Sequence, residues 1–133
     1  MTRHEMREAA LLILFQMRLN DSTEEELLQD NVDAFELEYN SNSLKLVNGV
    51  LENDALLTEI IAKYSPSRAV DRISLMNRTI MQIALYEMKF CPSVPDKVAI
   101  NEAVELSKEY CQKNDTAFIN GVLSSYYKEN GDE

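Results

Sequence analysis

The sequence predicts an all-α fold of about seven helices, for three reasons. Only three glycines and three prolines interrupt the 133 residues, and such scarcity favours helices over many short strands. Apolar side chains recur every three or four residues through most of the chain, which is the spacing of one helix face. The length suits a single domain, and 45% hydrophobic residues can form a sizeable core.

The first helix is predicted over residues 3–19. Thr2 and Glu5 have the spacing of a capping box, in which the hydroxyl and the carboxylate each accept a backbone N–H. The middle of the segment is apolar nearly all round, which is typical of a central helix. We interpret the segment as part of the mature fold and not as a signal peptide, because it lacks a small-residue cleavage site.

The second helix is predicted over residues 22–38, where Ser22 and Glu25 repeat the capping-box spacing. No lysine or arginine occurs from Asp21 to Asn40. We interpret this acidity as a solvated helix face. Because the segment carries much of the negative charge, the rest of the chain is closer to neutral.

The middle of the chain is predicted to form three helices. The third covers residues 43–64, and Pro66 ends it because the residue before a proline disfavours helical geometry. A short fourth helix is expected over residues 68–72. The fifth is expected over residues 75–88, where apolar side chains again share one face.

Two further helices follow a connector at residues 91–95, which is rigid because it contains two prolines. The second proline suits the first turn of the sixth helix, which is expected to end near Tyr110. Asn114 or Asp115 is expected to cap the seventh helix. Residues 130–133 are expected to be a frayed polar tail.

Two similar segments, residues 46–51 and 118–123, each contain an Asn-Gly pair. Such a pair between apolar residues is a hairpin signal, but the flanks keep the helical period, so we favour helix over hairpin. A glycine inside a helix costs about 1 kcal/mol relative to alanine. We hypothesise that Gly49 and Gly121 offset this cost by close approach of another helix.

The residue types favour binding over catalysis. The chain contains no phosphate-binding glycine loop, dinucleotide fingerprint or nucleophile elbow. Cys91 and Cys111 are too few for a disulfide scaffold, and with His4 as the one histidine we expect no metal site and no cofactor. No apolar run approaches the roughly 18 residues of a membrane span. We therefore expect a cytoplasmic binding protein that makes no contact with a membrane.

Charge is distributed unevenly along the chain. The net charge is −10, which taken alone argues against nucleic acid, because phosphate contacts need lysine and arginine. A local basic patch can still bind. Ordinary surface arginines are the alternative interpretation. The two locally basic regions are the chain start, with Arg3, His4 and Arg7, and the region of Arg68, Arg72, Arg78 and Lys89.

Five segments carry a resemblance to a known family. They are RHEMREA at residues 3–9, LVNGV at 46–50, IALYE at 83–87, VPDKVAINEAVELSK at 94–108 and FINGVL at 118–123. Together, and in this order, they resemble the NusB family of transcription antitermination factors over nearly the whole chain. The VAINEA part is quite specific to that family.

The resemblance implies two small helical bundles packed together, which we place at about residues 1–66 and 67–129 of one NusB-like domain. It also implies that the protein binds the boxA element of nascent single-stranded RNA together with the small-subunit ribosomal protein NusE. That complex joins RNA polymerase and suppresses termination in ribosomal RNA operons. The alternative is a protein–protein adaptor of the same fold with weak or lost RNA binding, which the net charge of −10 favours.

The resemblance assigns residues to two surfaces. Phe118 is suited to stacking on a base, but its apolar helix face equally suits core packing, and Asn120 equally suits a cap. The chain departs from the family pattern at Gln82, where an arginine is common, at Asn77, where an acid is common, and near Arg68, where a tryptophan is common. The implied RNA-binding residues are Arg3, His4, Arg7, Gln82, Asn114, Phe118 and Asn120, and the implied partner-binding residues are Asp71, Asn77 and Arg78.

Overall fold

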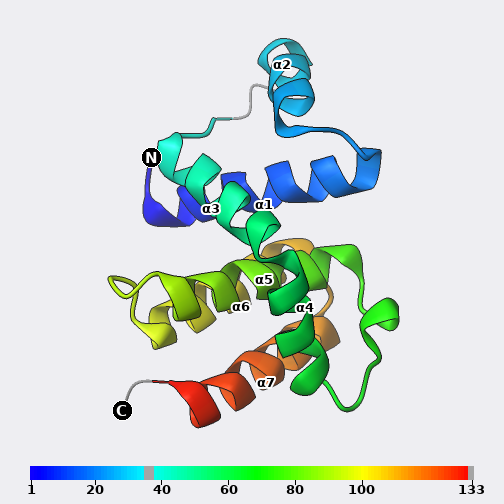
Figure 1. The fold of residues 1–133 in the computed structure, drawn as a ribbon, viewed down its shortest axis with the longest axis vertical. Coiled ribbons are helices and arrows are strands. Elements are labelled where there is room, and N and C mark those ends of the chain that lie inside the picture. Colours follow the sequence, from blue (N-terminus) through cyan, green and yellow to red (C-terminus); the bar gives the residue numbers. More distant parts are fainter. Residues whose placement is uncertain (35–37, 132–133) are drawn as a thin grey trace. The chain divides into compact units, whose positions relative to one another are not determined.

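The computed structural model describes residues 1–34 and 38–131, and the regular elements of this part of the chain are all helical (Figure 1). The all-α prediction is therefore confirmed. Residues 35–37 of the second predicted helix and residues 132–133 of the predicted tail lie outside the described part. None of the described helices combines the length and apolar character that a membrane crossing requires. The elements are α1 (Arg3–Asn20), α2 (Glu24–Ala34), α3 (Ser41–Glu52), α4 (Asp54–Lys63), the 3₁₀ helix η1 (Val70–Arg72), α5 (Leu75–Phe90), α6 (Asp96–Tyr110) and α7 (Lys113–Asn130).

The chain divides into two compact units, Met1–Gly49 and Val50–Glu133. The predicted boundary near residue 66 differs from this division. The units divide earlier because α4 packs against α5 and η1, so that residues 50–66 group with the second unit. The last residues of α3, from Val50 onward, also belong to the second unit.

The start of α1 has the predicted capping box. Thr2 Oγ1 accepts the Glu5 N–H at 3.0 Å, and the Thr2 N–H donates to Glu5 Oε1 at 2.9 Å. These bonds lower the pKa of Glu5 and keep its carboxylate ionised at the positive end of the helix. Within the first unit, the Ser43 hydroxyl donates to the Met6 carbonyl at 3.2 Å and so ties α3 to α1.

The cap of α2 begins one residue later than the sequence analysis predicted. Thr23 Oγ1, and not the Ser22 hydroxyl, accepts the Glu26 N–H at 3.2 Å, and it also donates to Glu26 Oε1 at 3.0 Å. The reason lies in the end of α1. Asp21 adopts a left-handed φ of 52°, and the Ser22 N–H donates to the Met17 carbonyl at 3.0 Å. Ser22 therefore belongs to the ending of α1, which leaves Thr23 to start α2.

The single helix predicted over residues 43–64 is wrong, because the chain breaks at Asn53 into α3 and α4. Asn53 has φ −112° and ψ 18°, outside helical geometry. Its N–H donates to the Val50 carbonyl at 3.2 Å, a tightened last turn, and its carbonyl accepts the Leu57 N–H at 2.9 Å to start α4. Asparagine and aspartate favour helix ends over helix interiors, which suits the Asn53-Asp54 pair to this break.

Helix α5 is the central helix of the second unit, with α4, α6 and α7 packed against it (Figure 1). Ser74 Oγ accepts the Asn77 N–H at 3.1 Å and caps its start. Between α6 and α7, the buried Ser107 hydroxyl lies 2.9 Å from that of Thr116. Aliphatic burial, at about 25 cal/mol per Å², is the main stabilising contribution. The fully buried aliphatic side chains of this unit include Leu57, Ile61, Ile80, Leu85, Leu106, Ile119 and Leu123.

Helix α7 begins at Lys113, so neither Asn114 nor Asp115 is its N-cap residue. Gln112 takes that position, and its N–H donates to Asp115 Oδ2 at 3.3 Å. The predicted cap residue thus acts from the first turn of the helix, where a carboxylate is favoured. At the other end the helix continues to Asn130, the first residue of the predicted tail.

Both Asn-Gly pairs lie inside helices, as predicted, in α3 and α7. The hypothesis of close helix approach is wrong for Gly121. This glycine is exposed, and a Cβ built on it would meet nothing within 4 Å. Gly49, in contrast, is buried. The two similar segments therefore place their glycines in different environments.

Candidate functional site

The start of α1 exposes less positive charge than its sequence suggests. Arg3 is exposed and His4 is half-buried, but Arg7 is only 2% exposed. A guanidinium keeps its charge when buried and requires partners there, and both His4 and Arg7 interact with other residues. Arg3 is therefore the member of this group that is most available to a phosphate.

An aromatic ring and a guanidinium are stacked at the start of α7. The Arg68 guanidinium carbon lies 4.2 Å from the centroid of the Phe118 ring. Arg68 Nη1 also lies 3.3 Å from Asp115 Oδ1, one turn earlier on the same helix. Phe118 is half-buried, so it is neither a core residue nor fully exposed. One ring face is occupied by a cation that a carboxylate holds in place.

Asp115 connects this stacked pair to α5. Burial raises the pKa of Asp115, but hydrogen bonds from the Asn77 side chain, the Gln112 backbone and Arg68 outweigh burial, so that the pKa is lowered overall. The carboxylate is therefore ionised at neutral pH. It holds the Arg68 guanidinium over the ring by charge-assisted hydrogen bonding.

The three implied partner-binding residues differ in exposure. Asp71 in η1 is exposed, and Arg78 in α5 is half-buried. Asn77 is only 2% exposed, and its side chain donates to Asp115. Asn77 therefore helps to position the stacked pair, and Asp71 is the member of the group that is most open to a partner.

Gln82, which the resemblance assigned to the RNA surface, is fully buried at 0% exposure. Its Nε2 donates to Asp54 Oδ1 at 2.8 Å and to Thr58 Oγ1 at 3.2 Å, both in α4. Its Oε1 is buried without a partner among the described residues. The side chain holds α4 against α5, so a direct RNA contact at Gln82 does not fit its position in the structure.

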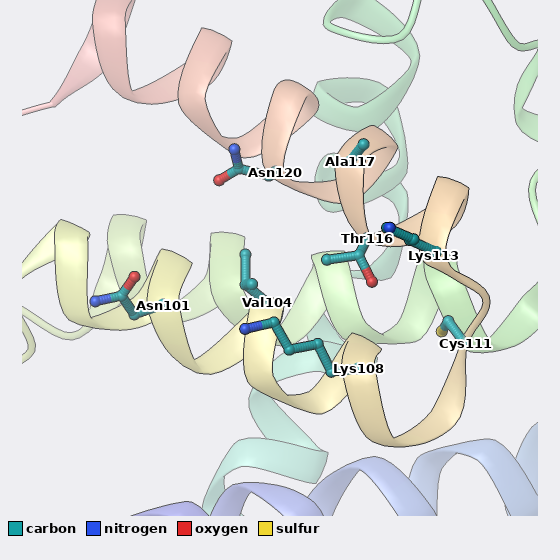
Figure 2. A pocket seen from close by; sticks show the side chains of 8 residues that line it. All are labelled: Asn101, Val104, Lys108, Cys111, Lys113, Thr116, Ala117 and Asn120. Carbon is teal, nitrogen blue, oxygen red and sulfur yellow. The ribbon is translucent and has the colours of Figure 1, made fainter.

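A groove of about 570 Å³ lies between α6 and α7 (Figure 2). Asn120 and Asn101 line it from the two helices, and both are exposed. Cys111 lies near the turn between the helices, where burial, together with the Asp115 charge, raises its thiol pKa to about 11. The thiol is therefore neutral at physiological pH. The lining residues are Asn101, Val104, Lys108, Cys111, Lys113, Thr116, Ala117 and Asn120.

Sequence reasoning did not connect Arg68 and Asp115 to Phe118. In the sequence, Arg68 belongs to a basic region and lies near a position where the family commonly has a tryptophan, and Asp115 is a candidate helix cap. The sequence separation of 47 between Arg68 and Asp115 leaves no local pattern that relates them. Since the two residues lie in separate segments of the second unit, only the fold brings them together.

The fold and the site define a helical binding protein. Its exposed groups are a partly covered aromatic ring, arginines and side-chain amides. Such groups stack on bases, pair with phosphates and hydrogen-bond base edges in protein–RNA complexes. The comparisons with known proteins agree with this class.

The chain belongs to the NusB family, whose model matches residues 4–128. The transcription antitermination protein NusB of Bacillus subtilis (strain 168) is 38% identical over 125 residues, which cover 94% of each chain. The protein of the same name from Clostridium botulinum (strain Alaska E43 / Type E3) is 35% identical over 133 residues, covering 97% of this chain and 100% of the relative.

Solved structures show the same fold. NusB of T. maritima superposes with a TM-score of 0.84 at 28% identity, covering 99% of this chain and 94% of that chain. A chain from the crystal structure of the antitermination factors NusB and NusE in complex with dsRNA superposes with a TM-score of 0.81 at 25% identity, covering 96% of each chain. The resemblance found in the sequence is thus confirmed.

Proposed function

We propose that this protein is a transcription antitermination factor that binds boxA-type RNA together with the ribosomal protein NusE. In this function it joins the antitermination complex of RNA polymerase and suppresses termination in ribosomal RNA operons. It acts in the cytoplasm, by binding and without catalysis. The observation that carries the proposal is the family match over residues 4–128.

The stacked pair supports RNA binding in physical terms. Arg68 covers one face of Phe118 at 4.2 Å, and the ring is only half-buried. A base stacked on an aromatic ring contributes about 1–3 kcal/mol. The nearby exposed Asn114 supplies an amide at the start of the same helix. We assign base stacking to Phe118 and support of the ring to Arg68.

Weak RNA binding by the isolated protein follows from the same geometry. The net charge is −10, and both Arg7 and Gln82 are buried. Two positions of the implied RNA surface are therefore closed to phosphates, and the excess of carboxylates over cations opposes binding to a polyanion. We expect NusE to supply a share of the RNA affinity. These observations also favour a second candidate function, a protein adaptor of the same fold that has lost RNA binding.

Fluorescence anisotropy of a labelled boxA RNA, titrated with the protein in the presence and absence of NusE, tests the proposal. A scrambled RNA of equal length is the control. We expect boxA-selective binding that becomes tighter when NusE is present. Binding to NusE with equal affinity for both RNAs would support the adaptor, and the absence of binding to either RNA and to NusE would refute both functions.

A further inference from the structure

The groove between α6 and α7 has the size of a ligand site, and of its lining residues only Asn120 belongs to the RNA-binding set that the resemblance implies. Its volume of about 570 Å³ lies within the range of small-ligand pockets. Val104 and Ala117 supply apolar surface, and the amides of Asn101 and Asn120 lie on the two facing helices (Figure 2). The groove therefore combines an apolar lining with polar groups on both sides, as sites for planar polar ligands do.

The two amides are available to a ligand. Asn101 and Asn120 are both exposed, and neither side chain makes a hydrogen bond to the described residues. A side-chain amide offers two donors and an acceptor, and so it can match the edge of a nucleobase. Unstacked bases in single-stranded RNA are read through such edges.

The charge of the groove differs from that of the whole chain. Its lining includes Lys108 and Lys113 and no carboxylate, although the net charge of the chain is −10. Lys108 does pair with Glu105 at 3.3 Å, but the two side chains are 60% and 57% exposed. An exposed pair of this kind contributes little and is readily exchanged for a phosphate. The groove therefore favours an anionic ligand, such as a phosphate group, over a cationic one.

The outer face of α7 beside the groove has little side-chain bulk. Ala117 lines the groove, and Gly121 follows one turn later on the same face. Both residues are exposed, and nothing lies within 4 Å of a Cβ built on Gly121. A polynucleotide strand can therefore approach the backbone of α7 closely at this point.

We propose that the groove between α6 and α7 holds one nucleotide of single-stranded RNA, next to the segment that stacks on Phe118. The amides of Asn101 and Asn120 hydrogen-bond the base edge, and Lys108 and Lys113 bind the flanking phosphates. This inference rests on the proposed RNA-binding function and adds a second nucleotide site to it. The site contributes sequence selectivity through its amides and salt dependence through its lysines.

The first test uses a variant that fills the open face without harming the fold. Gly121→Met adds a long side chain of good helix propensity where the structure has free space. We expect the protein to be at least as stable as wild type but to bind boxA RNA in the NusE complex several-fold more weakly. Gly121→Ala, which adds only a methyl group, is the matched control for the change in helix propensity.

The second test separates base reading from charge. Asn101→Ala with Asn120→Ala should lower the preference for boxA over scrambled RNA by roughly 2- to 10-fold. Lys108→Gln and Lys113→Gln should weaken the binding of boxA and of scrambled RNA alike. They should also reduce the slope of log affinity against log salt concentration by about 0.7 for each phosphate contact. Lys128→Gln, the same charge change at an exposed position near the end of α7, should leave binding and slope unchanged.

The third test reports the position of the RNA. Cys111 lines the groove and Cys91 does not, and both are half-buried free thiols. Bound boxA RNA should slow alkylation of Cys111 by N-ethylmaleimide, measured by mass spectrometry, while Cys91 reacts at its usual rate.

These experiments distinguish a failure of the proposed RNA-binding function from a failure of the groove inference. If the wild-type protein binds no RNA even with NusE, the proposed function is refuted, and the groove inference is refuted with it. If wild type binds boxA selectively but the groove variants bind equally well and Cys111 is not protected, the groove inference is overturned and the RNA-binding function remains. Loss of NusE binding in Gly121→Met, with RNA binding by the protein alone unchanged, would assign this face to a protein and also overturn the inference.

Discussion

Single residues in this protein show how burial separates side chains that look alike in the sequence. Arg3 and Arg7 are four residues apart on one helix, yet Arg3 is exposed and Arg7 is buried. Gln82 looks like a polar surface residue of α5, but it is fully buried and holds α4. Because burial depends on distant segments of the chain, no local pattern could have predicted these positions.

The position of Gln82 predicts the behaviour of Gln82→Leu. Leucine removes the buried Oε1 that has no partner among the described residues, and Asp54 is exposed and can regain water. The stability gained by removing this unpaired oxygen nearly cancels the stability lost with the Nε2 hydrogen bonds to α4. We expect the free energy of unfolding, measured in urea, to stay within about 1 kcal/mol of wild type, and RNA affinity in the NusE complex to stay unchanged. Loss of RNA binding by a stable variant would contradict the buried position.

The lowered pKa of Asp115 predicts a pH dependence. A carboxyl group with a lower pKa in the folded state than in the unfolded state stabilises the fold above its unfolded pKa, near 3.8. That contribution is lost as the pH falls through the folded pKa. Urea unfolding should therefore show Asp115→Asn to be less stable than wild type at neutral pH, by up to about 1 kcal/mol. The difference should shrink below pH ~4; an equal difference at both pH values would contradict the ionic role.

Helices were predicted well where their signals are local. The box at Thr2 and the stop after Tyr110 depend on neighbouring residues and were found in the sequence. The break at Asn53 was missed because apolar residues keep the helical period on both sides of it. The capping of α2 was misplaced by one residue because Ser22 is used by the end of α1. When two adjacent helices can use the same residue, a single capping motif does not show which helix uses it.

The cap of α2 provides a prediction with an internal control. Thr23→Ala removes the acceptor of the Glu26 N–H and should lower the free energy of unfolding by about 1 kcal/mol. Ser22→Ala removes a buried hydroxyl that has no partner among the described residues, so it should not destabilise the protein. Thermal unfolding of both variants measures the difference. The reverse order of stability would restore the original assignment of the cap to Ser22.

At the scale of the whole molecule, the fold class could be predicted and most of the site could not. The small number of glycines and prolines and the helical spacing of apolar residues are properties of the entire chain, and they predict the all-α class that the structure has. The stacked pair of Arg68 and Phe118 joins residues that are far apart in the sequence of the second unit. The resemblance pointed to Phe118, but the cation beside it and the carboxylate of Asp115 required the structure.

The net charge of −10 makes RNA binding the central claim to test. A chain in which carboxylates outnumber cations must rely on stacking, on amides and on its partner more than on phosphate contacts. The affinity should therefore be sensitive to the aromatic ring at α7. It should also depend on NusE more than on ionic strength.

The most direct measurement is the dissociation constant of boxA RNA, with NusE present, for wild type and for Phe118→Ala. We predict that wild type prefers boxA over scrambled RNA and that Phe118→Ala loses about 1–3 kcal/mol of boxA affinity, while its affinity for NusE alone is unchanged. Equal boxA affinity in the two proteins, or no preference for boxA in wild type, would contradict the account.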